Sequence, residues 1–118
     1  MSDIEIHDER DRGLLAARAA GDPQGSTFGY IQYFVLDAPE RALVPVHTVV
    51  EPQHEGRGIA GSLARELYAI AARESIAVAP LCPFVVQWAA RHPGEAPAAP
   101  PELMDAAQRA LADDSAKW

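Results

Sequence analysis

The run from Gln53 to Gly61 constrains this chain most, because it places three glycines, Gly56, Gly58 and Gly61, between an apolar strand-like segment and an amphipathic helix. Glycine has no Cβ, so consecutive backbone N–H groups can turn inward and approach an anion closely. The helix that follows adds the positive end of its dipole. The run therefore predicts a loop that wraps around a pyrophosphate.

Two phosphate-binding patterns fit these glycines, and their surroundings distinguish them. Residues 56–61 read G-x-G-x-x-G, the dinucleotide fingerprint, which also needs a tight strand-to-glycine turn and an acidic residue about 20 positions further on. The preceding apolar run ends at Val50, which leaves 51–55 as a loop, and the next expected strand, 76–81, contains no acid. Read from Gln53 instead, the run fits Q/R-x-x-G-x-G/A, with Gln53, Gly56 and Gly58 at the matching positions.

That second pattern resembles the acetyl-CoA loop of the GNAT superfamily of N-acetyltransferases. The likeness continues on both sides of the loop, over residues 14–94, and is similar to the small YjdJ-type branch. It is carried by the blocks His47-Thr48-x-Val50, Gly56-Arg57-Gly58-Ile59-Ala60, Pro80-Leu81-Cys82-Pro83-Phe84-Val85 and Arg91-His92-Pro93. The resemblance implies an α+β, minimal GNAT-like fold in which an antiparallel β-meander is followed by α-β-α.

Length and composition agree with a single compact domain. A chain of 118 residues with 48% hydrophobic content buries more than about 60% of its unfolded surface, enough for one core without disulfides. We expect a domain over 1–96 and, over 97–118, a Pro/Ala linker with an acidic C-terminal helix. This helix either folds back or dimerises, or it is a frayed appendage without a role. The single cysteine, the lack of a signal-peptide pattern and the lack of a membrane-length apolar run predict a cytoplasmic protein.

The net charge of −7 is concentrated at the two ends of the chain, which leaves the middle nearly neutral. Acidic ends are most simply solvated flanks, although they would also attract a cationic amine. The sequence contains no basic stripe with interleaved aromatic residues, so it does not predict binding to RNA or DNA.

Three strands are expected before the glycines, at 13–19, 27–36 and 43–50, because apolar and β-branched runs there alternate with turn residues at 21–25 and 37–40. Pro45 within the third strand predicts a bulge, since proline cannot donate to a ladder. After the loop, the spacing of Ile59, Leu63, Leu67 and Ile70 predicts an amphipathic helix.

Beyond that helix, residues 76–81 predict a short buried strand, parallel to the third. Pro83 fits the first position of a helix over 84–91. In the tail, residues 102–113 predict a last helix with one apolar face, formed by Leu103, Met104, Ala107 and Leu111.

The resemblance implies how an acetyl thioester would be held. Backbone N–H groups of the loop would bind the phosphates, and the strand edge before the loop would bind the pantetheine and the carbonyl. The residues concerned are Val49, Val50, Gln53, His54, Glu55, Gly56, Arg57, Gly58, Ile59, Ala60 and Gly61. Arg57 either adds charge at the phosphates or is a solvated arginine at the helix entry.

Cys82 is the sharpest catalytic candidate. Pro83 disfavours the α conformation at Cys82, so the thiol should lie extended, immediately before a helix N-terminus, a setting that favours the thiolate. Larger GNAT enzymes often place a tyrosine acid after this strand, whereas this chain has no tyrosine after Cys82. Cys82 would then protonate the leaving thiol or accept the acetyl group; the alternative is a small buried residue at the strand–helix junction.

His47 is the second catalytic candidate, as a base facing the substrate or as a hydrogen-bonded structural residue. His54 is expected to be exposed, and His92 to cap or pack. The histidines and the cysteine have no ligand spacing, so no metal site is predicted. Phe84 and Trp88 are expected in the core, and only one of Tyr30 and Tyr33 can face a given cleft.

The sequence therefore predicts an acetyl-CoA-dependent N-acetyltransferase that acts on an unidentified amine, carried either by a protein or by a small molecule. The alternative is a non-catalytic CoA-binding module with a regulatory or interaction role. The missing tyrosine and the lack of an acidic pair placed to deprotonate an amine favour that alternative. The chain lacks the usual long N-terminal helical pair, which predicts an open acceptor side. Either a monomer or a homodimer fits.

Overall fold

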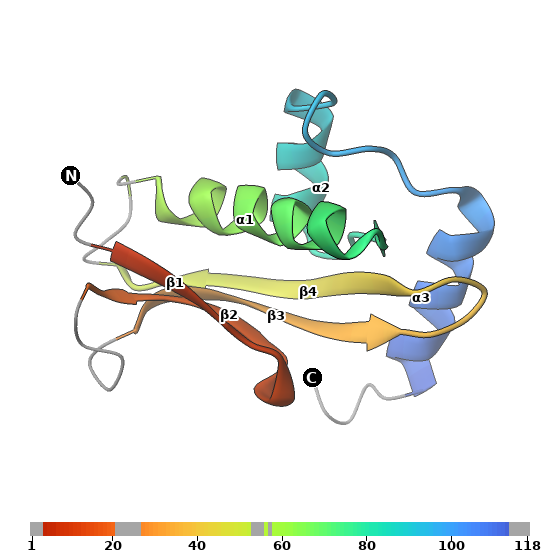
Figure 1. The fold of residues 1–118 in the computed structure, drawn as a ribbon, viewed down its shortest axis with the longest axis horizontal. Helices are drawn as coiled ribbons and strands as arrows, with labels where there is room; N and C mark the ends of the chain where they lie inside the picture. Colours follow the sequence, from red (N-terminus) through yellow and green to blue (C-terminus); the bar gives the residue numbers. More distant parts are fainter. Residues whose placement is uncertain (1–3, 21–26, 53–55, 57, 114–118) are drawn as a thin grey trace.

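A computed structural model describes residues 4–20, 27–52, 56 and 58–113 of the chain. The described strands form one sheet in the order β1-β2-β3-β4-β5, with α1 and α2 on one face and α3 on the other (Figure 1). The elements are β1 (Ile4–Glu9), η1 (Arg10–Arg12), β2 (Leu14–Ala19), β3 (Thr27–Leu36), β4 (Ala42–Val50), α1 (Ile59–Glu74), β5 (Ala77–Val78), α2 (Pro83–Arg91) and α3 (Pro101–Asp113). The predicted α+β class is confirmed.

The antiparallel meander has one strand more than the sequence predicted. β1 pairs with β2 in register from Ile4↔Ala19 to Glu9↔Leu14. Acidic residues dominate this stretch and favour a solvated flank on composition, but the alternating Ile4 and Ile6 pack against the core. The predicted turn at 21–25 lies outside the described residues.

A bulge in β4 lies where Pro45 predicted one. The β3–β4 register passes from Gln32↔His47 to Tyr33↔Pro45, so Val46 is the extra residue on β4. An extra residue reverses which face of the sheet the following side chains point to. Leu43 accordingly packs beneath α1, whereas beyond the bulge it is Thr48 and Val50 that take this side.

The helix after the glycines is confirmed as amphipathic. Its buried side chains are Ile59, Leu63, Ala64, Leu67, Tyr68, Ile70 and Ala71, and they pack on the sheet with Leu15, Ile31 and Leu43. Figure 1 shows α1 lying along this face of the strands. The helix thereby fixes the position of its own N-terminus at the end of the glycine loop.

The predicted parallel strand is present but shorter than 76–81. β5 pairs with β4 only through Ala42↔Ala77 and Leu43↔Val78. Single hydrogen bonds continue from Ala79 N to Leu43 O, at 2.9 Å, and from Leu81 N to Pro45 O, at 3.1 Å. The β4 bulge begins at Pro45, which has no N–H to donate, so regular pairing stops there. Among the described residues, no backbone hydrogen bond joins this segment to β4 beyond Pro45.

The last two helices begin with proline, as the sequence indicated for Pro83. Pro83 stands at the first position of α2, with Cys82 as its N-cap. The tail folds back on the sheet through α3, whose buried Leu103 and Ala107 pack with Ala42 and Val44 of β4. Because Leu43 and Val44 point to opposite faces, α1 and α3 enclose β4 from its two sides.

Polar pairs fasten the periphery of the sheet. Arg10 donates two hydrogen bonds to Glu74 at the end of α1, at 2.7 and 2.8 Å, and this bonding lowers the pKa of Glu74. The hydroxyl of the buried Tyr33 donates to Asp8 of β1. Burial, assisted by Asp8, raises the pKa of Tyr33 to about 12.

Candidate functional site

A cavity lies between the open end of β4, the glycine loop and the starts of α1 and α2. Its volume is about 430 Å³, and its walls are formed by Thr48, Val50, Gly56, Gly58, Ile59, Ala60, Gly61 and Phe84. Backbone and small side chains form most of these walls. The cavity therefore offers peptide N–H groups and apolar surface, which suits an anion with an extended apolar arm.

Gly56 and Gly58 give the loop a conformation that other residues rarely adopt. Their φ angles are 83° and 77°, in the left-handed region that favours glycine. Among the described residues, a Cβ added at either position would meet no atom within 4 Å apart from its chain neighbours. Backbone conformation, and not crowding, therefore accounts for glycine at both places, and the space beside them is open to a ligand.

The N-terminus of α1 points its first peptide groups into this region. Gly58 is the N-cap and supplies no side-chain cap, and no acidic residue lies in the first turn. The first N–H groups of a helix have no partner within the helix and carry its positive dipole end. A phosphate would satisfy these donors.

The cofactor-binding residues predicted from the sequence divide into three groups. The cavity brings together Val50, Gly56, Gly58, Ile59, Ala60 and Gly61. Val49 lies on the opposite side of β4 and is 41% exposed, because neighbouring side chains of a strand point to opposite faces. Gln53, His54, Glu55 and Arg57 lie outside the described residues.

Cys82 has the backbone geometry that its position before Pro83 predicted. It is extended, with φ −70° and ψ 125°, and caps the N-terminus of α2. Its side chain is only 3% exposed and does not line the cavity. Its Sγ atom lies 3.1 Å from the hydroxyl oxygen of Thr48, which does line the cavity.

Thr48 and Phe84 are the wall residues that sequence reasoning missed as site residues. Thr48 was available from the sequence as the partner of Val50 at two-residue spacing on one strand face. Phe84 packs against the core, as predicted, and also borders the cavity from α2. A residue at a core margin can serve both purposes, and spacing alone does not separate them.

His47 lies away from the cavity. It is exposed, and its cross-strand partner is Gln32, on the sheet face opposite α1. The same face carries a second cavity of about 300 Å³, lined by Arg12, Leu14, Ala16, Arg18, Thr27, Tyr30 and Gln32. Tyr30 is thus the tyrosine that faces a groove, whereas Tyr33 is buried under α1. The two catalytic candidates, Cys82 and His47, belong to opposite sides of β4.

Aromatic stacking holds α2 against α1 beside the cavity. Trp88 stacks on Tyr68, with ring centroids 5.9 Å apart, and on His92, at 4.2 Å. His92 Nδ1 also lies 2.8 Å from the Trp88 carbonyl oxygen, so His92 packs and caps as expected. Burial raises the pKa of Tyr68 to about 12.

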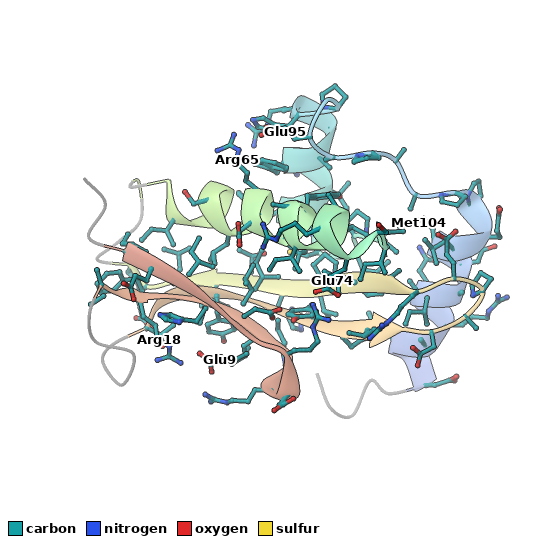
Figure 2. The ribbon with its side chains drawn as sticks, in the orientation of Figure 1. Glu9, Arg18, Arg65, Glu74, Glu95 and Met104 are labelled. Carbon is teal, nitrogen blue, oxygen red and sulfur yellow. The ribbon has the colours of Figure 1, made fainter. Side chains whose placement is uncertain are left out.

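Two ion pairs lie outside the walls of the first cavity. Arg65 of α1 reaches Glu95 beyond α2, with Nε 2.9 Å from the carboxylate, and this hydrogen bond lowers the pKa of Glu95. On the other side of the sheet, Arg18 donates to Glu9 at 2.8 Å, beside the second cavity (Figure 2).

In the described ranges, no cluster of three or more His, Cys, Asp or Glu side chains is placed to hold a metal ion. No described helix has the length and apolar character needed to cross a membrane.

Comparisons with known proteins converge on one family. A family model described as GCN5-related N-acetyl-transferase matches residues 18–98. A solved structure of a ribosomal-protein-alanine N-acetyltransferase from Brucella melitensis biovar Abortus 2308 is 27% identical, with a TM-score of 0.54. That match covers 74% of this chain and 62% of the other, so this chain spans less than two thirds of its relative's length. No curated protein matches the chain.

Proposed function

This chain belongs to the GCN5-related N-acetyltransferase family, and from that premise we propose that it binds acetyl-CoA and transfers the acetyl group to an amine. Its fold is a minimal form of the GNAT fold, and within the family we assign it to the small YjdJ-type branch. The observation that carries the proposal is the cavity where left-handed glycines, a helix N-terminus whose N-cap residue is glycine and an open strand edge meet.

The cofactor would occupy that cavity in two parts. Backbone N–H groups between Gly56 and Gly61, joined by those of residues 53–55 and 57, would bind the phosphates. The pantetheine arm would run along the edge of β4 at Val49 and Val50, where β5 no longer pairs, and main-chain groups there would bind the acetyl carbonyl. The main chain of Val49 can serve this role even though its side chain points to the other face.

The proposed reaction is direct transfer within a ternary complex. The amine nitrogen attacks the thioester carbonyl, a C–N bond forms, the C–S bond breaks, and the departing sulfur gains a proton. We assign Cys82 as the source of that proton and not as the acetyl acceptor. Its burial favours this role, because an attacking thiol needs access to the carbonyl.

The acceptor would approach from the face of the sheet that carries His47 and Tyr30. Among the described residues, no α-helix contributes to the lining of the second cavity, which includes Gln32, the partner of His47. His47 would take the proton that the amine loses. The solved relative is named as a ribosomal-protein-alanine N-acetyltransferase, so a peptide with N-terminal alanine is the first acceptor to test. We keep the cytoplasmic location expected from the sequence as part of this proposal.

The experiment that tests the function follows both products. Purified protein is incubated with acetyl-CoA and, separately, an alanine-initiated peptide, a lysine peptide and spermidine, and CoA and acetylated amine are quantified by mass spectrometry. The proposal expects equal amounts of both products with at least one amine. Binding of CoA without product from any amine would favour a non-catalytic CoA-binding module, and absence of binding would contradict both functions.

The same samples separate the two roles of Cys82. Direct transfer predicts that intact protein mass stays unchanged with acetyl-CoA alone. A stable gain of one acetyl group, lost in Cys82→Ala, would assign the acetyl to Cys82 instead.

A further inference from the structure

The geometry points to Thr48 as the residue that passes a proton between the buried Cys82 and the sulfur of acetyl-CoA. This inference rests on the proposed function and adds a residue to it. The hydroxyl oxygen of Thr48 is 3.1 Å from Cys82 Sγ, while Thr48 also lines the cavity and Cys82 does not. Thr48 therefore stands between the thiol and the space where the thioester would lie.

Burial explains why the thiol needs an intermediary. Cys82 is 3% exposed and packs in the core cluster that includes Val85 and Trp88. A sulfur of a ligand bound in the cavity would meet Thr48 before Cys82, because Thr48 lines the cavity and Cys82 does not. A hydroxyl donates one hydrogen bond and accepts others, so Thr48 can accept from the S–H of Cys82 while donating to a second sulfur.

The β4 bulge sets up this pair. Leu43 faces α1, and if β4 alternated regularly through Val46, then His47 and Val49 would continue on that side. The bulge places Thr48 and Val50 there instead. The Pro45 carbonyl oxygen also accepts the N–H of Cys82, at 3.0 Å. One irregularity thus fixes the side of β4 on which Thr48 lies and the depth at which Cys82 lies.

The proton balance of the step is complete. As the C–S bond breaks, its electron pair goes to the CoA sulfur, which takes the Thr48 hydroxyl proton. Thr48 takes the S–H proton of Cys82 in the same movement, which leaves a Cys82 thiolate. His47 takes the proton lost by the acceptor nitrogen and releases it to solvent, and the Cys82 thiolate regains a proton from solvent after the products leave. Acetyl-CoA and the amine are the only reactants, and no oxidant or reductant is needed.

A set of four variants tests the relay with acetyl-CoA and the amine that the wild-type protein turns over. Thr48→Val removes the hydroxyl at nearly the same shape, Thr48→Ser keeps it, Cys82→Ala removes the thiol, and the double variant removes both. General acid catalysis contributes about 10²-fold or more, so Thr48→Val should lower kcat by at least about 10-fold. Its CoA affinity and KM for acetyl-CoA should stay within about 3-fold, because the hydroxyl acts in the transition state.

Two further outcomes distinguish a relay from a structural effect. Thr48→Ser should recover most of kcat, and the double variant should be no slower than the slower single variant, because residues acting as a unit are not additive. The relay is overturned if Thr48→Val keeps wild-type kcat, if Cys82→Ala does, or if the two losses multiply. In each of those cases a working wild-type enzyme leaves the proposed function standing. A wild-type protein without turnover refutes the function and the relay together.

Discussion

The backbone N–H of Cys82 donates to the carbonyl oxygen of Pro45 at 3.0 Å, which ties the start of α2 to the bulged part of β4. The same oxygen accepts from Leu81 N at 3.1 Å. Beyond this point β4 has no described β5 partner, and its edge opens into the cavity. The relationship therefore marks the place where the sheet stops being paired and the proposed binding edge begins.

Replacing Gly58 tests whether its left-handed backbone matters to the cavity. Gly58→Ala forces an L-residue into φ 77°, which costs about 1–2 kcal/mol, and it should weaken CoA binding as the loop relaxes. Gly94→Ala is the matched control, since an added Cβ there also meets no atom of another described residue within 4 Å and no left-handed φ is involved. Thermal unfolding and calorimetric titration with CoA measure both effects. Equal results for the two variants would contradict the account.

Gly29 lies close to Val50 and Ile59, two residues that line the cavity. A Cβ at Gly29 would lie 2.9 Å from the Val49 carbonyl oxygen and 3.2 Å from side-chain atoms of Ile59 and Val50. Gly29→Ala should therefore push β4 and the start of α1 apart and destabilise the fold by about 1–3 kcal/mol, as overpacking commonly does. Urea unfolding measures the loss of stability. A variant as stable as wild type would contradict the prediction, because the atoms around the new Cβ would then move aside without loss of free energy of unfolding.

Stability should fall in acid through the Glu9–Arg18 pair. The hydrogen bond from Arg18, the largest cause, lowers the pKa of Glu9 below its ordinary value of 4.5. A carboxyl whose pKa is lower when folded stabilises the fold above the unfolded pKa and loses that contribution as pH falls through the folded pKa. The free energy of unfolding of Glu9→Gln should consequently fall less than that of wild type below about pH 4.5. Glu40→Gln, an exposed position in a turn, is the control, and an identical acid dependence in Glu9→Gln and wild type would contradict the prediction.

Alkaline pH should act through Tyr33. Burial raises the pKa of this phenol from 10.0 to about 12, so the unfolded chain ionises first and the fold loses stability as pH rises from 10 to 12. Tyr33→Phe should reduce that loss of stability. Part of the loss should remain, because the pKa of Tyr68 is also raised to about 12. At neutral pH the variant should be less stable by about 1–2 kcal/mol, because Asp8 loses a donor. An unchanged alkaline loss in Tyr33→Phe, followed by circular dichroism, would count against this assignment.

Local sequence patterns predicted an element correctly where a clear periodicity or a single proline identifies it. The 3.6-residue spacing from Ile59 to Ile70 identified α1, Pro83 identified the start of α2, and Pro45 identified the bulge. β1 was missed because its composition is acidic and its two isoleucines are too few to outweigh it. β5 was predicted too long because an apolar run does not reveal where its partner strand turns away.

The glycines that line the candidate cavity could be predicted from the sequence, because backbone conformation requires them. The residues of β4 could not, because their role depends on the face of the sheet to which each side chain points. Glycine spacing located the loop, which then came together with Val50 in one cavity. The reversal of faces by the bulge moved His47 and Val49 to the other side and brought in Thr48. A proline shows that a bulge occurs nearby, but the register that follows depends on pairing with Gln32 and Tyr33 across the sheet.

The most direct test of the central claim is an NMR titration of the ¹⁵N-labelled protein with CoA. Binding in the proposed cavity predicts saturable shifts of the amides of Thr48, Val50, Gly56, Gly58 to Gly61 and Phe84, with little change at Leu14, Ala16 and Tyr30 around the second cavity. Shifts confined to the second cavity, or no saturable shifts up to millimolar CoA, would contradict the account.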